Sequence, residues 1–170
     1  SVAERAGRAL IDCSLELGGK NPLLVLEDAD PRKAARGAIR ACFPNAGQLC
    51  ISAERLYIHE SVYDEFRDTF VSETRALELG TGFEYGPDMG SLQSAAQLQK
   101  TERHVDDAVE KGADVLVGGR PRPDVGPYFY EPTVLADVSP DMALFDEETF
   151  GPVVSLYPVG SVDEAVERAN

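Results

Sequence analysis

The feature that most constrains the fold is an alternation of short apolar runs with longer stretches in which apolar residues recur at helical spacing. We predict strands in the apolar runs at residues 11–17, 22–26, 56–58, 115–117, 133–135 and 153–157. We predict helices at residues 1–10, 30–42, from 61 onward, 94–111 and 161–170. We predict loops, rich in glycine and proline, at residues 81–90 and 120–132. Alternating helices and strands are typical of an α/β domain with a mainly parallel sheet.

Residues that are typical of helix starts support three of these helices. Asp30 is a predicted N-cap, and Pro31 follows it at the first helical position, where a missing N–H costs nothing. Ser61 with Asp64 resembles a capping box, and residues 161–164 (SVDE) match the same pattern. These signals indicate that the helical periodicity is local structure rather than chance.

Composition and charge exclude several classes of protein. Hydrophobic residues make up 43% of the chain, which is typical of a globular domain. No apolar run approaches the length that spans a bilayer, so we expect no membrane association. The formal net charge is −14. A nucleic-acid-binding protein needs a basic face to displace counterions, so we expect no nucleic-acid partner.

The three cysteines, Cys13, Cys42 and Cys50, argue against a disulfide framework and against a structural zinc site. Their number is odd, and no two of them form a C-x-x-C pair. We therefore predict no metal site. The free thiols and the absence of a secretory leader favour a cytoplasmic protein. Cys13 and Cys42 are interpreted as core residues, because free cysteines are among the most buried side chains.

Two residues are candidates for chemistry on the residue pattern alone. Glu16 lies in an apolar run before Gly18 and Gly19. A carboxylate buried there would have the raised pKa that suits a general base, whereas a solvent-facing glutamate at a strand end is the structural alternative. Cys50 follows a loop at residues 45–49, where nucleophiles occur, whereas a small buried hydrophobe is the structural alternative. The residues alone leave both interpretations open.

Neither a Cys–His dyad nor a glycine-rich phosphate-binding loop is predicted from the sequence. His59 ends a predicted strand and His104 lies among charged residues of a predicted helix, so we do not expect a Cys–His dyad. The chain contains no phosphate-binding loop and no G-x-G-x-x-G motif. No segment therefore predicts a pyrophosphate site of the usual kind.

Three motifs, in order along the chain, carry a resemblance to a known family. They are the glutamate motif at residues 15–22 (LELGGKNP), the cysteine motif at residues 45–50 (NAGQLC) and the third motif at residues 147–153 (EETFGPV). With a smaller block at residues 132–135 (PTVL), they resemble the aldehyde dehydrogenases along essentially the whole chain. The resemblance implies the catalytic domain of that family, a three-layer αβα sandwich with a mainly parallel sheet.

The resemblance implies NAD(P)-dependent oxidation of an aldehyde to its carboxylic acid. Cys50, as a thiolate, would attack the carbonyl to give a thiohemiacetal, and its own backbone N–H would donate to the oxyanion. Loss of a hydride to the nicotinamide would leave a thioester. Glu16 would then activate the water that hydrolyses this thioester.

The resemblance also implies which residues bind NAD or NADP. Glu148 matches the residue that holds the nicotinamide ribose, and Phe150 matches one that packs near the nicotinamide. The backbone of Leu17 is similar to one that meets the carboxamide. Gln97 and Lys100 fall where the family often places ribose contacts, although a solvated helix face would also carry such residues.

Parts of the family's fold are expected outside this chain. Residues 1–17 match the end of the cofactor-binding region, and residues 18–170 match the catalytic domain without its C-terminal part. Most of the dinucleotide-binding domain, with the asparagine that completes the oxyanion hole, would precede Ser1, and the helix at residues 1–10 shows no start signal of its own. We therefore predict that the 170-residue chain alone is inactive and that the full-length protein is a homo-oligomer.

The resemblance narrows the substrate without fixing it. Residues 42–52, with Glu54 and Arg55, most resemble a bacterial branch named succinate-semialdehyde dehydrogenase, so succinate semialdehyde is the first expectation. Better-known enzymes of that name carry an arginine where this chain has Pro44, and that arginine would grip the far carboxylate of the substrate. A broad-specificity aliphatic aldehyde dehydrogenase is therefore the alternative.

Two further alternatives differ in chemistry. An acylating dehydrogenase passes the acyl group to coenzyme A and needs no water-activating base, so the intact glutamate motif favours the hydrolytic type. A non-catalytic relative keeps the fold and usually loses the cysteine or the glutamate, and this chain has both Cys50 and Glu16.

Overall fold

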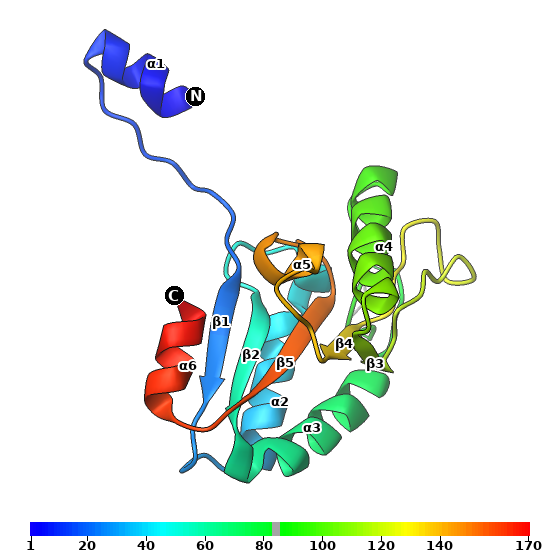
Figure 1. Cartoon of the computed structure of the whole chain (residues 1–170). Coiled ribbons are helices and arrows are strands. Elements are labelled where there is room, and N and C mark those ends of the chain that lie inside the picture. The colour runs from blue at the N-terminus through cyan, green and yellow to red at the C-terminus, as the bar shows by residue number, and fades with distance from the viewer. Residues whose placement is uncertain (83–85) are drawn as a thin grey trace.

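The centre of the molecule is a twisted sheet, seen in a computed structural model that describes residues 1–82 and 86–170 (Figure 1). In that part of the chain the sheet has five strands in the order β1-β2-β5-β4-β3. The strands are β1 (Asn21–Val25), β2 (Ala53–His59), β3 (Asp114–Val117), β4 (Thr133–Ala136) and β5 (Val153–Val159). The β1–β2, β2–β5 and β5–β4 pairs are parallel, and only β3 runs antiparallel to its neighbour. The predicted mainly parallel sheet is confirmed.

Helices cover both faces of this sheet. In Figure 1, α2 (Pro31–Cys42) lies behind the strands and α3 (Glu60–Arg75) packs against it at the bottom of the view, whereas α6 (Val162–Ala169) lies to the left of β1 and contacts β2 and β5. The other helical segments are α1 (Val2–Ala9), η1 (Pro44–Gly47), α4 (Ala95–Glu110) and α5 (Ala143–Asp146). This arrangement is the three-layer αβα sandwich that the sequence predicts.

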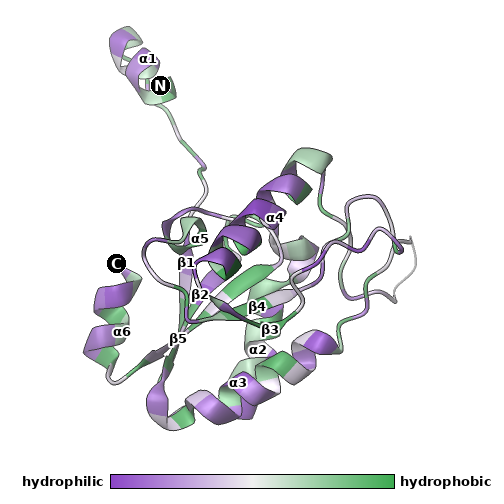
Figure 2. Cartoon of the chain, turned by 45° about the vertical axis from the view of Figure 1, so that its right-hand side comes forward, coloured by the Kyte–Doolittle hydropathy of each residue, from purple (hydrophilic) through white to green (hydrophobic). Residues whose placement is uncertain are grey.

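The core lies between the sheet and α2 and α3. Leu56 and Ile58 of β2 are fully buried, as are Phe66 and Phe70 of α3. The two phenylalanine rings stack at a centroid distance of 5.5 Å, and Phe43 extends the stack to Phe70 at 6.0 Å. Figure 2 shows the complementary pattern, with hydrophobic strands at the centre and hydrophilic outer faces on α3 and α4. Burial of these apolar faces is what holds the layers together.

Five of the six predicted strands are present, and the prediction of a strand at residues 11–17 is wrong. Residues 11–17 form no strand and are exposed over their whole length. A strand needs a partner that accepts its backbone hydrogen bonds, and β1, the next element, pairs with β2 instead. A run of apolar residues indicates that the segment favours burial, but it does not show whether another strand is close enough to pair with it.

Two helices start differently from the predictions, and one predicted loop is described only in part. Ser1 caps α1 in a complete capping box with Glu4, so this helix does have a start signal. The third helix begins at Glu60 rather than Ser61, because the side chain of His59 accepts a hydrogen bond from the Ser61 N–H. The predicted loop at residues 81–90 lies partly outside the described residues.

We call residues 10–18 the N-terminal arm. It is extended and separates α1 from the body of the molecule (Figure 1). Leu10 is 94% exposed and Leu17 is 74% exposed. Cys13 is exposed as well, so its interpretation as a core residue is wrong, whereas Cys42, at 1% exposure, is confirmed as core.

Candidate active site

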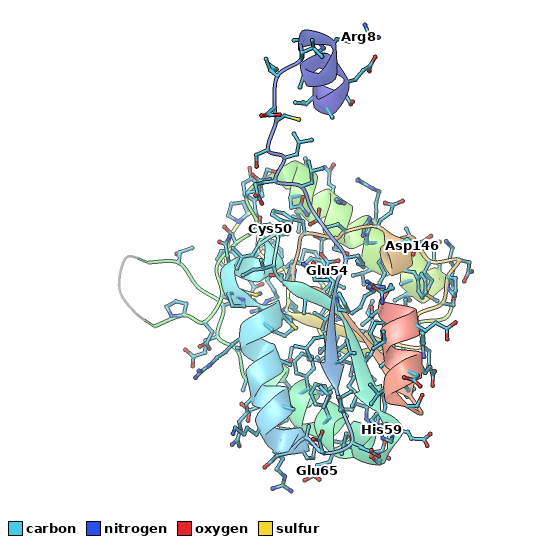
Figure 3. The ribbon with its side chains drawn as sticks, turned by 90° about the vertical axis from the view of Figure 1, so that its left-hand side faces the viewer. Arg8, Cys50, Glu54, His59, Glu65 and Asp146 are labelled. Atoms are coloured by element: carbon cyan, nitrogen blue, oxygen red, sulfur yellow. The ribbon has the colours of Figure 1, made fainter. Side chains whose placement is uncertain are left out.

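The three motifs meet because each of them comes just before a parallel strand. The glutamate motif runs into β1, the cysteine motif precedes β2, and the third motif leads into β5. These strands are neighbours in the sheet and run in the same direction, so their amino ends lie at the same edge. Figure 3 shows Cys50 and Glu54 at this edge, with His59 at the opposite end of β2.

An open cleft of about 410 Å³ lies at this edge. The residues that line it are Glu16, Leu17, Gly18, Cys50, Gln97, Lys100, Glu148 and Phe150. Every candidate residue predicted from the sequence, catalytic or cofactor-binding, is in this set. The structure thus brings all of them to one cleft, from the N-terminal arm, the loop before β2, α4 and the third motif.

Glu16 and Cys50 reach the cleft from exposed positions. Neither side chain is buried, and Glu16 lies in the N-terminal arm rather than in a strand. Of the two interpretations of Glu16, burial in an apolar strand is wrong, because residues 11–17 form no strand and the side chain is exposed to solvent. What remains of the prediction is that the thiol and the carboxylate face the same cavity.

The backbone of the cysteine motif is tightly wound. Asn45, Ala46 and Gly47 have left-handed backbone conformations, with φ of 53°, 55° and 70°. A side chain at position 47 would meet the carbonyl oxygen of Gly151 at 2.2 Å, so this position requires glycine. The winding brings Cys50 out of the core and to the cleft within a few residues of the end of α2.

Polar side chains fix this winding. The Gln48 amide donates to the backbone oxygen of Asn45 at 2.9 Å, and its oxygen accepts from the Gln93 N–H at 2.8 Å. The Asn21 amide donates to the backbone oxygens of Cys50 at 2.7 Å and Ser52 at 2.9 Å. Asn21 therefore ties the glutamate motif to the residue that carries the thiol.

The glutamate motif also contacts the third motif directly. The N–H of Gly19 donates to Glu148 Oε1 at 3.1 Å. A Cβ atom at position 18 would lie 2.1 Å from Glu148 Oε2, so the absence of a side chain at Gly18 leaves room for that carboxylate. Glu148 is thereby held at the cleft wall, half-buried, by the segment that carries Glu16.

The peptide that joins Thr149 to Phe150 is held from both sides. Glu54 accepts hydrogen bonds from the N–H of Thr149, at 2.9 and 3.1 Å, and from the N–H of Phe150, at 2.9 Å. The Gln97 amide donates to the carbonyls of Thr149 at 2.8 Å and Phe150 at 2.9 Å. Gln97 thus lies at the cleft as predicted, but its amide nitrogen is engaged with backbone.

A buried ion pair lies behind the cleft. Lys20 binds Glu54, and their side chains are 10% and 4% exposed. Burial lowers the pKa of Lys20 below its usual value, and the attraction of Glu54 opposes that shift. Glu54 therefore has its charge balanced by Lys20 and its oxygens satisfied by backbone donors.

His104 supports the same region from α4. Its Nδ1 lies 3.1 Å from Thr149 Oγ1, and its Nε2 lies 3.4 Å from the Glu147 carboxylate. Burial, followed by the nearby cations Lys100 and Lys20, lowers the pKa of His104, so the neutral form is favoured. His104 belongs to the packing of the third motif and lines no part of the cleft around Cys50.

Sequence reasoning missed Asn21, Gln48 and Glu54 as residues that shape the site. Asn21 and Gln48 lie inside the quoted motifs, so the motifs themselves were the available signal. Glu54 gave a weaker signal, a carboxylate among the mostly apolar residues of a strand. The backbone groups that bind it lie 95 and 96 residues further along the chain, so no local sequence pattern predicts these contacts.

A comparison with protein families identifies the group to which the chain belongs. The aldehyde dehydrogenase family matches residues 1–170. The chain belongs to the aldehyde dehydrogenase family. The resemblance inferred from the three motifs is confirmed, as is the expected fold.

Curated relatives within the aldehyde dehydrogenases are similar over the whole chain. A protein of Mycobacterium tuberculosis named "Putative succinate-semialdehyde dehydrogenase (NADP(+)) 2" is 57% identical over 169 residues, which cover 99% of this chain and 33% of the relative. A protein of Mycolicibacterium smegmatis with a similar name is 54% identical over 170 residues, covering 100% of this chain and 33% of the relative. The chain thus spans about a third of the length of these relatives.

Solved aldehyde dehydrogenases have the same fold. Succinate-semialdehyde dehydrogenase from Burkholderia pseudomallei matches with a TM-score of 0.93 and 40% identity, covering 99% of this chain and 35% of that one. The NAD+ complex of an aldehyde dehydrogenase from Bacillus cereus matches with a TM-score of 0.93 and 37% identity, covering 99% of this chain and 34% of that one. Among the described residues, no helix has the length and apolar character that crossing a membrane requires.

Proposed function

We propose that the intact protein oxidises an aldehyde to its carboxylic acid with NAD(P)+, with Cys50 as nucleophile and Glu16 as general base. The observation that carries the proposal is the shared cleft: Cys50, Glu16 and the cofactor candidates all line it. Membership of the aldehyde dehydrogenase family supports the same reaction.

The chemistry follows from what each side chain offers. The Cys50 thiolate adds to the aldehyde carbon and forms a C–S bond, and the carbonyl oxygen becomes an oxyanion to which the Cys50 N–H donates. The thiohemiacetal then loses a hydride and becomes a thioester. Glu16 takes a proton from water, which attacks the thioester carbon, and the C–S bond breaks to release the acid and the thiolate. An exposed Glu16 has access to that water.

The residues at the cleft fit a nicotinamide riboside. Glu148 offers a carboxylate that can accept from ribose hydroxyls, Phe150 offers an aromatic ring, and Gly18 leaves the space that Glu148 occupies. Leu17, Gln97 and Lys100 complete the wall, with Lys100 supplying a positive charge. NAD(P)+ supplies the hydride acceptor when bound. Its other half would be held by residues outside this chain, consistent with residues 1–17 being the end of a cofactor-binding region.

Succinate semialdehyde is the proposed substrate. The names of the mycobacterial relatives and of the Burkholderia structure support this choice. A broad aliphatic aldehyde is the second candidate, because Pro44 is an exposed residue that cannot bind a carboxylate through its side chain. We also propose that the full-length protein is a cytoplasmic homo-oligomer whose catalytic domain begins near residue 18.

The test is to assay the intact protein with NAD+ and NADP+ against a panel of aldehydes. We expect kcat/KM to be higher for succinate semialdehyde than for butanal, and equal values would assign the broad-specificity alternative. The absence of turnover with every aldehyde and both cofactors would refute the enzymatic proposal.

Cysteine and glutamate variants test the roles. Cys50→Ala should lower kcat by on the order of 10³-fold or more, because it removes the nucleophile. Cys13→Ala is the matched control, since Cys13 is also an exposed thiol and should leave turnover unchanged. Glu16→Gln should give a burst of reduced cofactor followed by slow turnover as the thioester accumulates. A Glu16→Gln variant with an unchanged steady-state rate would contradict the assigned base.

A further inference from the structure

Glu54 makes contacts that the proposed reaction does not use. It belongs to β2, four residues after Cys50, and its side chain is 4% exposed. A buried carboxylate costs much free energy unless donors and an opposite charge satisfy it. Here two backbone N–H groups and one lysine do so, and all three lie beside the cleft.

These partners come from the two segments that meet at the cleft, the glutamate motif and the third motif. Lys20 follows the residues that carry Glu16 and Gly18, whereas Thr149 and Phe150 follow Glu148. The carboxylate of Glu54 is therefore a point at which both segments are fixed to the strand that follows the cysteine motif.

The backbone conformation of Phe150 is stabilised by these hydrogen bonds. Phe150 has a φ of 53°, a left-handed conformation that is unfavourable for a residue with a bulky side chain. Such a conformation persists only where the surroundings over-determine it. Glu54 holds the N–H groups on one side of this peptide and Gln97 holds the carbonyls on the other.

We propose that Glu54 is a positioning residue: its carboxylate, paired with Lys20, holds Glu148 and Phe150 in register with Glu16 and Cys50. The inference rests on the proposed function, since it concerns the cofactor side of the same cleft. Glu54 itself does not line the cleft and acts only through the backbone and Lys20.

A purely structural ion pair would behave differently. Replacing a buried ion pair by apolar or neutral residues of similar size is often neutral for stability. If Lys20 and Glu54 served stability alone, a neutral pair such as Lys20→Met with Glu54→Gln would restore both folding and function. If Glu54 positions Glu148 and Phe150, the double variant should fold and still bind the cofactor poorly, because the N–H groups of Thr149 and Phe150 then meet a neutral amide instead of a charged acceptor.

The experiment uses the intact protein and the variants Glu54→Gln, Glu54→Asp and the Lys20→Met/Glu54→Gln pair. Melting temperature reports folding, titration calorimetry with NADP+ and NAD+ reports cofactor binding, and steady-state kinetics separate the KM values. Glu65→Gln is the matched control, since it removes a carboxylate from the exposed Arg32–Glu65 pair.

We expect Glu54→Gln and the double variant to raise the cofactor Kd and KM about tenfold, the size of one charge-assisted hydrogen bond. The KM for the aldehyde should change less than about twofold, and Glu54→Asp, which keeps the charge, should recover part of the loss. Should Glu54→Gln fail to fold, the double variant and Glu54→Asp carry the test.

The outcomes separate this inference from the proposed function. A folded double variant with the cofactor Kd of the wild type would overturn the positioning role. If the wild type binds cofactor but oxidises no aldehyde, the proposed function fails, and the Kd values still decide the role of Glu54. If the wild type binds neither cofactor, both are overturned.

Discussion

The two segments that wall the cleft are held in opposite ways. The N-terminal arm brings Glu16 and Leu17 to the cleft with no backbone hydrogen bond from residues 12–18 to any other described residue. The third motif brings Glu148 and Phe150 to the cleft through a peptide that is firmly held. Glu54 accepts from the N–H groups of Thr149 and Phe150, Gln97 donates to their carbonyls, and the Thr149 hydroxyl lies within hydrogen-bond distance of His104.

The two segments differ in whether contacts within this chain fix their positions. The third motif is fixed by residues of this chain, including a buried ion pair, and its geometry is a property of the fold. The arm carries apolar side chains that are largely exposed, and the chain is attached to the third motif and to Glu54 only from Gly19 and Lys20, which follow the arm. The positions of Glu148 and Phe150 are therefore preorganised, whereas the position of Glu16, the proposed general base, is not fixed by contacts within the described chain.

The largest expected effect comes from a change that forces the cysteine and third motifs apart. Gly47→Ala places a methyl group against the Gly151 carbonyl oxygen, at 2.2 Å, in a position with a φ of 70°. Backbone strain and the clash together should lower the free energy of unfolding by about 4 kcal/mol. Denaturant unfolding monitored by circular dichroism measures the change.

The matched control for Gly47→Ala is Gly37→Ala, which lies in α2 with nothing near its added methyl group. That change should be neutral or stabilising by about 1 kcal/mol, because alanine favours helix. Equal effects of the two substitutions would show that the contact between the motifs is not tight.

The contrast between the two walls also marks the limit of sequence reasoning. The runs that became β1, β2 and β5 were recognisable because each is apolar and short, so the strand after every motif could be predicted. That these strands are neighbours could not be predicted, because pairing is a long-range property. The arm failed as a strand for the same reason, since residues 11–17 are apolar but have no partner strand. Glu54 was missed because its charge is balanced by Lys20, 34 residues away.

Amide hydrogen exchange should display the contrast directly. In the 170-residue chain, the amides of residues 12–18 should exchange at least about 100-fold faster than those of Thr149, Phe150 and Val153, which all donate hydrogen bonds. Mass spectrometry of peptic fragments from the two regions measures both rates in one sample. Comparable protection of the arm would mean that it docks in solution and that the walls are equally fixed.

The third motif should be sensitive to pH through His104. Burial, then Lys100 and Lys20, lowers its pKa below the usual 6.5, while the carboxylates of Glu147 and Glu54 oppose the shift. Between the lowered pKa and 6.5 the unfolded chain binds a proton that the folded chain does not. This contribution to stability is therefore complete above about pH 6.5 and is lost as the pH falls through that window.

One proton limits the slope to about 1.4 kcal/mol per pH unit. Unfolding free energies measured between pH 5 and pH 8 should fall more steeply toward acid in the wild type than in His104→Gln, which cannot titrate there. Parallel curves for the two proteins would remove His104 from the forces that hold the third motif.

The smallest effect on stability should come from Gly18→Ala, at the point where the two walls touch. The three atoms nearest to the added methyl group all belong to the Glu148 carboxylate, the end of a flexible side chain, and Gly18 does not have a left-handed backbone. Loss of the Gly19–Glu148 hydrogen bond costs about 1 kcal/mol, and the reduced freedom of the unfolded chain returns about as much. The free energy of unfolding should therefore stay within about 1 kcal/mol of the wild type, while the displaced Glu148 should raise the cofactor KM several-fold in the intact protein. An unchanged KM would mean that Glu148 holds no part of the cofactor, and a large loss of stability would mean that the arm is more firmly attached than its exposure indicates.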